Sequence, residues 1–330
     1  MKINIGLTSS SEILPLIKAG ADEFFCGIIP NEWRRKYERF FLSRREEYIC
    51  NFANYNDLGQ AISLAHKHQK NIYITFNALY YSNAIYPELQ KVLKKIISLG
   101  PDGLIIADLG LLLKLKEWGI NTPLILSGEF GIFNSYAIKS LERFKSIKRI
   151  IIQRYSTIQE IRSLIANFPD YEYEAFILNE RCPFVGSHCF ASHNLDLGDH
   201  LCFYFKDCQA KIVFRGKRSF SYFDKAYENL CVYNKRDKLL SLCKSITDDE
   251  GEKIPAHCGL CYLKDLKACG VGHLKIVSRG RTLEPKLQAL SLVKKVIDGN
   301  YDQAQIKKLY SKTFMENDPE PCGSKYLCYY

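Results

Sequence analysis

Residues 103–127 read GLIIADLGLLLKLKEWGINTPLILS, and this stretch shows how the chain is built. Residues 103–107 are a short apolar run of the kind that forms a buried strand. Residues 109–118 carry apolar side chains at helical spacing, and residues 123–127 are a second apolar run. The stretch therefore predicts strand, helix, strand, which is the repeating unit of a parallel sheet.

The same unit recurs along most of the chain. We expect strands at residues 3–8, 21–29, 71–78, 103–107, 123–127, 149–153, 172–178 and 273–278. We expect helices at residues 12–19, 55–68, 87–99, 109–118, 135–144, 157–168, 263–268 and 285–297. Eight strands separated by helices predict an α/β protein with a closed (β/α)8 TIM-type barrel. An open doubly wound sheet is the alternative, but no glycine-rich dinucleotide-binding turn follows the first strand.

The spacing of the units predicts four parts. Residues 1–181 hold the first seven β/α units, and residues 182–255 form a cysteine-rich insertion between the seventh and eighth strands. Residues 256–300 supply the last unit, and residues 301–330 form a C-terminal tail. The insertion is too long for an ordinary loop. Because it follows a strand, we expect it at the mouth of the barrel, where barrel enzymes place their active sites.

Composition limits the class of protein. The chain has 330 residues, a hydrophobic fraction of 47% and a net charge of +10. We find no secretory signal and no apolar run long enough to cross a bilayer, so we expect a cytoplasmic protein without a membrane partner. Eleven of the thirteen cysteines follow Arg181. Because disulfides do not persist in a reducing cytosol, these thiols indicate a metal or iron–sulfur centre.

Two cysteine motifs are candidates for that centre. Cys182 and Cys189 leave the seventh strand with six residues between them, and Cys258-Gly-Leu-Cys261 precedes the eighth strand. Strands seven and eight are neighbours in a barrel, so the two motifs would meet at one rim. Cys202 and Cys208 lie between them in the sequence. Four such thiolates could bind zinc or a cluster, and the irregular spacing favours a [4Fe–4S] cluster, with zinc as the alternative.

Polar residues near the strand ends are candidates for the lining of the mouth: Glu23, Asn77, Asp108, Glu129, Arg154 and Glu180. Arg154 and Arg281 could bind a carboxylate or a phosphate through the planar guanidinium group. We therefore take Arg154, Glu180 and Arg281 as candidate catalytic residues. Buried ion pairs that close the barrel are the alternative interpretation.

Basic residues form two denser groups. The group between Arg34 and Arg45 is interspersed with glutamates, which is typical of a solvated helix face. The group between Lys211 and Arg218 lies among aromatic residues, a combination that suits RNA or a flat anionic ligand.

Several motifs together resemble the U32 peptidase (collagenase-like protease) family. They are GADEFFCG at residues 20–27, Asn51-Phe52, NERC at residues 179–182 with Cys189, CGLC at residues 258–261 and GVGHLKIVSRGR at residues 270–281. The resemblance runs from the first strand to about Ile297, and the last motif is the most specific part of it.

The resemblance implies two kinds of activity. The family name implies a peptidase acting on collagen-like or other peptides. Several relatives are instead linked to oxygen-independent hydroxylation of ubiquinone precursors or of RNA, and they hold a four-cysteine [4Fe–4S] cluster. By the resemblance, Cys182 and Cys189 match two ligands, Cys208 or Cys202 a third, and Cys258 or Cys261 a fourth. It thus implies a redox enzyme with a small aromatic or RNA substrate and, as in some relatives, a homologous partner subunit.

Overall fold

We describe the protein from a computed structural model of the full chain. The structure describes residues 1–37, 42–45, 48–154, 156–179, 257–314 and 328–330. These residues belong to one compact unit, made of residues 1–189 and 256–330.

Parallel strands form the centre of this unit. They are β1 (Lys2–Gly6), β2 (Glu23–Ile28), β3 (Asn51–Phe52), β4 (Asn71–Phe76), β5 (Gly103–Ile106), β6 (Leu124–Leu126), β7 (Ile147–Ile151), β8 (Glu172–Asn179) and β9 (His273–Val277). Their order is β1-β9-β8-β7-β6-β5-β4-β2-β3, and β1 also pairs with β2. That last pairing closes an eight-stranded barrel, while β3 adds only to the end of β2.

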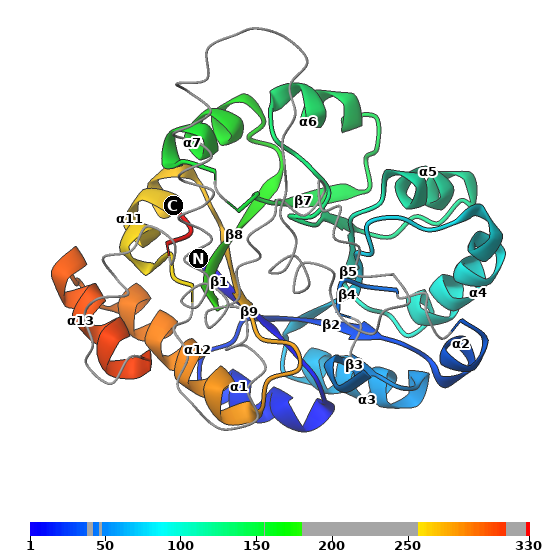
Figure 1. Ribbon diagram of the computed structural model, residues 1–330, viewed down its shortest axis with the longest axis horizontal. Coiled ribbons are helices and arrows are strands. Elements are labelled where there is room, and N and C mark those ends of the chain that lie inside the picture. The colour runs from blue at the N-terminus through cyan, green and yellow to red at the C-terminus, as the bar shows by residue number, and fades with distance from the viewer. Residues whose placement is uncertain (38–41, 46–47, 155, 180–256, 315–327) are drawn as a thin grey trace, which may run out of the picture. The chain divides into compact units, whose positions relative to one another are not determined.

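Helices surround the barrel (Figure 1). They are α1 (Ile13–Lys18), α2 (Asn31–Lys36), α3 (Tyr55–Lys67), α4 (Tyr86–Ile97), α5 (Leu109–Glu117), α6 (Ser135–Leu141), α7 (Ile158–Asn167), α11 (Leu263–Cys269), α12 (Leu283–Asp298) and α13 (Gln303–Phe314). Side-chain caps fix where several of them begin, because the first amide groups of a helix have no partner within it. Thr157, for example, starts α7 with a reciprocal capping box to Glu160.

Successive side chains of each strand point alternately outward and inward. The outward set, such as Phe24, Ile74 and Leu104, packs under the helices in the main hydrophobic core. The inward set forms a second, smaller cluster inside the barrel. It consists of one residue from each of six strands and one from the C-terminus: Phe25, Tyr73, Ile105, Ile125, Ile151, Phe176 and Tyr329.

The predicted barrel and its eight strands are confirmed. The sequence pattern did not reveal β3, because two residues are too few to show a period. Residues 303–314 form α13 inside the range that we expected to be a tail. Among the described residues, no helix is both long enough and apolar enough to span a bilayer. The predicted insertion at residues 182–255 lies outside the described residues.

Candidate functional site

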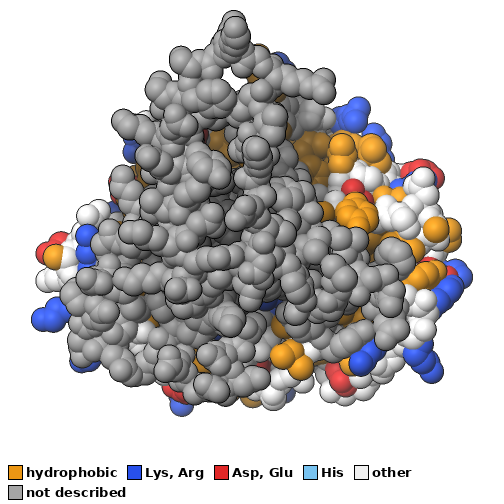
Figure 2. All heavy atoms as spheres, viewed as in Figure 1, with side chains coloured by type: hydrophobic (Ala, Val, Ile, Leu, Met, Phe, Trp, Pro, Cys, Tyr) orange, Lys and Arg blue, Asp and Glu red, His pale blue; other side chains and the backbone are white. Residues whose placement is uncertain are grey.

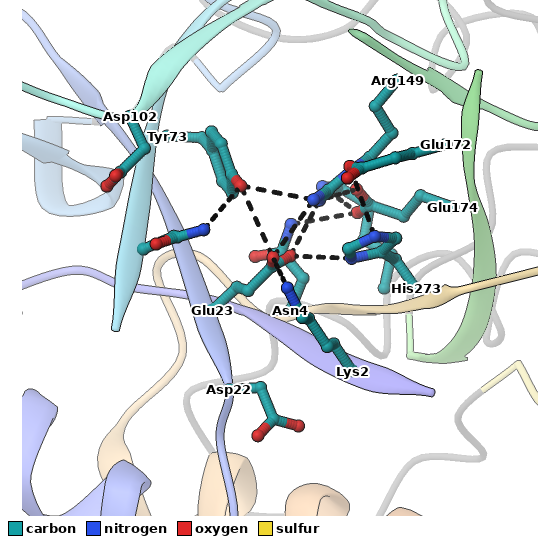
Figure 3. Close-up of polar contacts among 12 residues, drawn as sticks. Lys2, Asn4, Asp22, Glu23, Tyr73, Asp102, Arg149, Glu172, Glu174 and His273 are labelled. Atoms are coloured by element: carbon teal, nitrogen blue, oxygen red, sulfur yellow. Dashed lines mark hydrogen bonds and ion pairs between the residues drawn. The ribbon is translucent and has the colours of Figure 1, made fainter. Parts of the chain in front are cut away.

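Buried polar residues gather at both ends of the barrel, and the two groups differ. The first lies at the amino ends of the strands and is centred on Arg149 of β7, which is 2% exposed (Figure 3). Its guanidinium group binds both carboxylate oxygens of Glu23, at 2.8 and 3.1 Å. It also donates to Glu172 at 2.9 Å and to Glu174 at 3.2 Å.

The remaining partners of this group saturate its carboxylates. His273 lies 3.0 Å from Glu23, and Lys275 lies 2.9 Å from Glu174. Burial alone would raise the pKa of Glu23, but hydrogen bonds and charge from His273 and Arg149 lower it to about 2. Burial likewise opposes ionisation of Glu174, whereas Lys275 and Arg149 lower its pKa. Both carboxylates are therefore held ionised inside the barrel.

The Arg149 group is a structural network. It occupies the end of a TIM-type barrel that serves stability, and its charges satisfy one another. Our expectation that Glu23 lines the mouth is wrong, because Glu23 is the first residue of β2 and so lies at the opposite end. Here the alternative of buried ion pairs closing the barrel is the one that holds.

The second polar group lies at the carboxyl ends of the strands, which form the mouth. Arg279 follows β9, is 4% exposed and donates to the hydroxyl of Thr75 at 2.9 Å. It lies across Gly27, where a Cβ atom would sit 2.4 Å from the Arg279 Nη1 and 2.0 Å from the Asn51 Oδ1. The glycine of the GADEFFCG motif therefore leaves room for this arginine.

A second arginine of the mouth, Arg154, follows β7. It forms an ion pair with Glu129, and its guanidinium group lies 4.8 Å from the centre of the Phe176 ring. Arg44 also approaches Glu129, with 3.9 Å between the Arg44 Nε and a carboxylate oxygen. Two arginines thus share one carboxylate, which leaves this part of the mouth positively charged.

A further arginine, Arg281, lies over the end of β8. Its Nη1 is 3.5 Å from the side-chain oxygen of Asn179, the last residue of that strand. Burial lowers the pKa of Arg281, and the nearby Tyr329 opposes this effect. Asn179 has a φ of 75°, an uncommon conformation for a residue other than glycine. The carboxyl end of β8 is therefore locally constrained beside a partly buried cation.

Several buried polar atoms of the mouth lack a hydrogen-bond partner among the described residues, as does the side-chain oxygen of Asn4 beside the Arg149 network. Gln153 and Asn179 are 4% and 0% exposed, yet their side-chain amide nitrogens have no hydrogen-bond partner within the described part of the chain. One carboxylate oxygen of Glu129 likewise accepts no hydrogen bond from the described residues. Buried polar groups are almost always paired, and leaving one unpaired costs about 1–3 kcal/mol. Two amide donors beside arginines suit a bound ligand that presents acceptor oxygens.

The other candidates for the mouth have mixed outcomes. Asn77 lies there, where it accepts from the Arg44 backbone amide at 3.2 Å and donates to Ser127 at 3.4 Å. Asp108 caps α5 through the amide groups of Gly110 and Leu111 at 2.9 and 3.1 Å. Its carboxylate is thus committed to the helix. Glu180 lies outside the described residues, so its role stays a prediction.

Thiols lie next to the mouth. Cys258 pairs with Leu178 of β8, and Cys261 follows three residues later. Both side chains are partly exposed, and their soft sulfur atoms suit zinc or an iron–sulfur cluster. In the described part of the chain, no group of three or more His, Cys, Asp or Glu side chains is arranged to bind a metal ion. A metal centre would therefore need ligands beyond this set. Cys182, Cys189, Cys202 and Cys208 all lie outside the described residues.

The sequence did not single out Arg279 or Gln153. Arg279 was quoted only as part of the GVGHLKIVSRGR motif, and Gln153 ended a predicted strand. The signal that could have found them is their position. Each lies two residues after the last residue of a strand, Ile151 or Val277, so by alternation its side chain points to the inside of the barrel. Figure 2 shows that other Lys and Arg side chains are spread around the perimeter of the face in view, outside the grey atoms.

Together these features define a TIM-type barrel with a basic mouth and adjoining thiols. Comparison with known proteins agrees with this class. The chain matches the model of peptidase family U32 over residues 9–329, and it belongs to this family. The resemblance inferred from the motifs is thereby confirmed.

Two curated relatives and one solved structure illustrate the family. An uncharacterized protease of Methanocaldococcus jannaschii is 23% identical over 335 residues, which cover 95% of this chain and 72% of the relative. The tRNA hydroxylation protein P of Escherichia coli K12 is 28% identical over 146 residues, or 44% of this chain and 32% of the relative. The match thus spans about a third of that protein. The structure of a U32 peptidase aligns with a TM-score of 0.42 and 12% identity, covering 54% of this chain and 68% of that one.

Proposed function

We propose that this chain is an iron–sulfur enzyme of family U32 that takes part in the oxygen-independent hydroxylation of RNA, with tRNA as the substrate class. Relatives from several bacteria that match part of this chain are named tRNA hydroxylation proteins. The observation that carries the proposal is the mouth itself, where two buried side-chain amide donors without a hydrogen-bond partner among the described residues lie next to Arg154 and Arg281.

The residues of the mouth have distinct roles in this proposal. Arg154 and Arg281 bind an anionic oxygen of the substrate, and their charge also attracts the RNA backbone. The side-chain amide groups of Gln153 and Asn179 donate to carbonyl oxygens of the substrate base. Glu129 holds Arg154 in place beside the Phe176 ring. Glu180 remains a candidate catalytic residue because it directly follows Asn179.

The cofactor belongs to the same proposal. A [4Fe–4S] cluster supplies single-electron chemistry when it is bound. Cys182 and Cys189, with Cys208 or Cys202 and with Cys258 or Cys261, are its proposed ligands, and zinc is the alternative metal. A homologous partner subunit is also proposed, by analogy with the heterodimeric relatives.

The substrate can be tested in cells. A host strain that lacks its own tRNA hydroxylation proteins is complemented with the wild-type chain or with Gln153→Leu, and its tRNA nucleosides are analysed by mass spectrometry. We expect hydroxylated nucleosides with the wild type and at least a tenfold loss with the variant. The exposed Gln60 of α3 supplies the control Gln60→Leu, which should behave like the wild type. Absence of hydroxylation with the wild type, also under anaerobic growth, would contradict the proposal.

The peptidase activity implied by the family name is the second candidate. Incubation of the purified chain with gelatin and with a peptide library tests it. Cleavage that Arg154→Met abolishes would favour the peptidase over the redox enzyme.

A further inference from the structure

The last three residues of the chain pack against the barrel. Cys328 pairs with Cys258 as in a parallel sheet, and the amide of Tyr329 donates to the Cys258 carbonyl at 3.1 Å. The described C-terminus therefore lies beside the CGLC motif, although the two are about seventy positions apart in the sequence.

Two tyrosines fix this C-terminal segment. Tyr329 is 1% exposed, its ring stacks on Phe176 at 5.9 Å, and its hydroxyl donates to the carbonyl of Asn179. The Tyr330 hydroxyl donates to the carbonyl of Phe176 at 2.8 Å. The Tyr330 ring also lies over Gly259, where a Cβ atom would approach it to 2.9 Å. The position of Cys328 is thus set by the packing of its neighbours.

This pairing brings two thiols to the same place. Paired residues on adjacent strands point to the same side of the sheet, and the strands lie about 4.8 Å apart. Cys258 and Cys328 are both partly exposed, whereas Cys26, Cys50 and Cys269 are buried. Cys258 and Cys328 are therefore neighbours that both remain partly accessible to solvent.

The same thiols adjoin the exit of β8. Cys258 pairs with Leu178, and the amide of Gly259 donates to the Ile177 carbonyl at 2.8 Å. The chain leaves β8 after Asn179 and reaches Cys182 three residues later. The C-terminal segment thus holds a thiol at the rim where the predicted ligands begin.

We propose that Cys328 is a thiolate ligand of the metal centre of this chain and that it binds beside Cys258. The pair supplies two of the four soft ligands of a thiolate centre, either an iron–sulfur cluster or zinc, and Cys328 takes the position given above to Cys208 or Cys202. The inference rests on the proposed function only in requiring that a metal is bound. It assigns a role to a cysteine for which the sequence suggested none.

The test is the metal content of the full chain purified without oxygen. Iron, sulfide and zinc are measured for the wild type, Cys258→Ser, Cys328→Ser and the control Cys269→Ala, whose buried thiol faces α7 through the Ile158 carbonyl. We expect each of the two serine variants to lose at least half of the bound metal and the control to keep it. Iron together with sulfide identifies an iron–sulfur cluster, and zinc without iron identifies a zinc site.

Two further measurements separate a ligand from a structural residue. Tyr330→Phe loosens the anchor but keeps the thiol, so we expect it to retain its metal. Alkylation with iodoacetamide followed by mass spectrometry should label Cys328 at least fivefold more slowly in the metal-bound chain than after chelation.

Wild-type metal content in Cys328→Ser, or equal labelling of Cys328 in both states, would overturn this inference and leave the proposed function standing. The same holds if Tyr330→Phe loses as much metal as Cys328→Ser, since packing would then be the cause. A wild-type chain that binds no metal would overturn both.

Discussion

Replacement of Arg149 by methionine should strongly destabilise the barrel. The guanidinium group binds Glu23, Glu172 and Glu174, and the first and last of these are 1% and 0% exposed. Methionine retains much of the side-chain volume but none of the charge. In the variant, the cationic partners that Glu23 keeps among the described residues are His273 and Lys2, and Glu174 keeps Lys275.

The expected loss follows from the two carboxylates left behind. Breaking a buried ion pair by removing one partner costs about 3–5 kcal/mol, because the remaining charge stays desolvated. The pKa of Glu23, lowered from its ordinary 4.5 to about 2, corresponds to about 3 kcal/mol of favourable interaction, which Arg149 shares with His273. We therefore expect the free energy of unfolding to fall by about 3–5 kcal/mol, a large share of the 5–15 kcal/mol typical of a folded protein.

Urea unfolding followed by circular dichroism measures this loss. Lys148 lies next to Arg149 on β7 but is exposed, so Lys148→Met is the matched control and should change the free energy by less than about 0.5 kcal/mol. Adding Glu23→Gln to Arg149→Met removes one buried carboxylate that has lost its arginine partner. The double variant should therefore recover part of the lost free energy of unfolding. A loss below about 1 kcal/mol in Arg149→Met, with no recovery in the double variant, would refute this account of the network.

Three other predictions concern stability. The contribution of Glu23 to the free energy of unfolding should be complete above about pH 4.5 and disappear as the pH falls towards 2, because its pKa is lower in the folded than in the unfolded chain. The free energy of unfolding of Glu23→Gln should therefore depend less steeply on pH in that range. Gly27→Ala places a Cβ atom 2.0 Å from the Asn51 Oδ1 and should lower the melting temperature by several degrees. In Gly59→Ala of α3, the nearest contact of the new Cβ atom is at 3.5 Å, so the melting temperature should stay unchanged or rise. A lower melting temperature in Gly59→Ala than in Gly27→Ala would contradict the packing argument. Asp108→Ala removes the cap of α5 and should cost about 1 kcal/mol in urea unfolding, whereas Asp108→Asn, which can still cap, should cost less.

The fold was largely predictable because its signal is local. Each strand is a short apolar run and each helix a stretch with a period near 3.6, and such patterns are visible within ten to fifteen residues. The eight barrel strands were therefore found from the sequence. Strand β3 was missed because it has two residues and is defined only by its pairing with Gly27 and Ile28.

The site was only partly predictable, because a side chain's place depends on which end of a strand it occupies and on distant partners. Arg154, Glu129 and Arg281 were found at the mouth, as expected from their positions after strands. Glu23 was assigned to the wrong end, and Asp108 proved to be a helix cap.

By itself, the sequence determined the barrel, the family and the concentration of cysteines after Arg181, since periodicity and motif spacing are properties of neighbouring residues. Only the tertiary structure decided which charges saturate one another and which polar atoms remain open to a ligand. His273 meets Glu23 across 250 positions, and Cys328 meets Cys258 across about seventy. The first contact arises because barrel closure brings the early and late strands together, and the second because the C-terminal tyrosines bind to β8. No local pattern encodes either proximity.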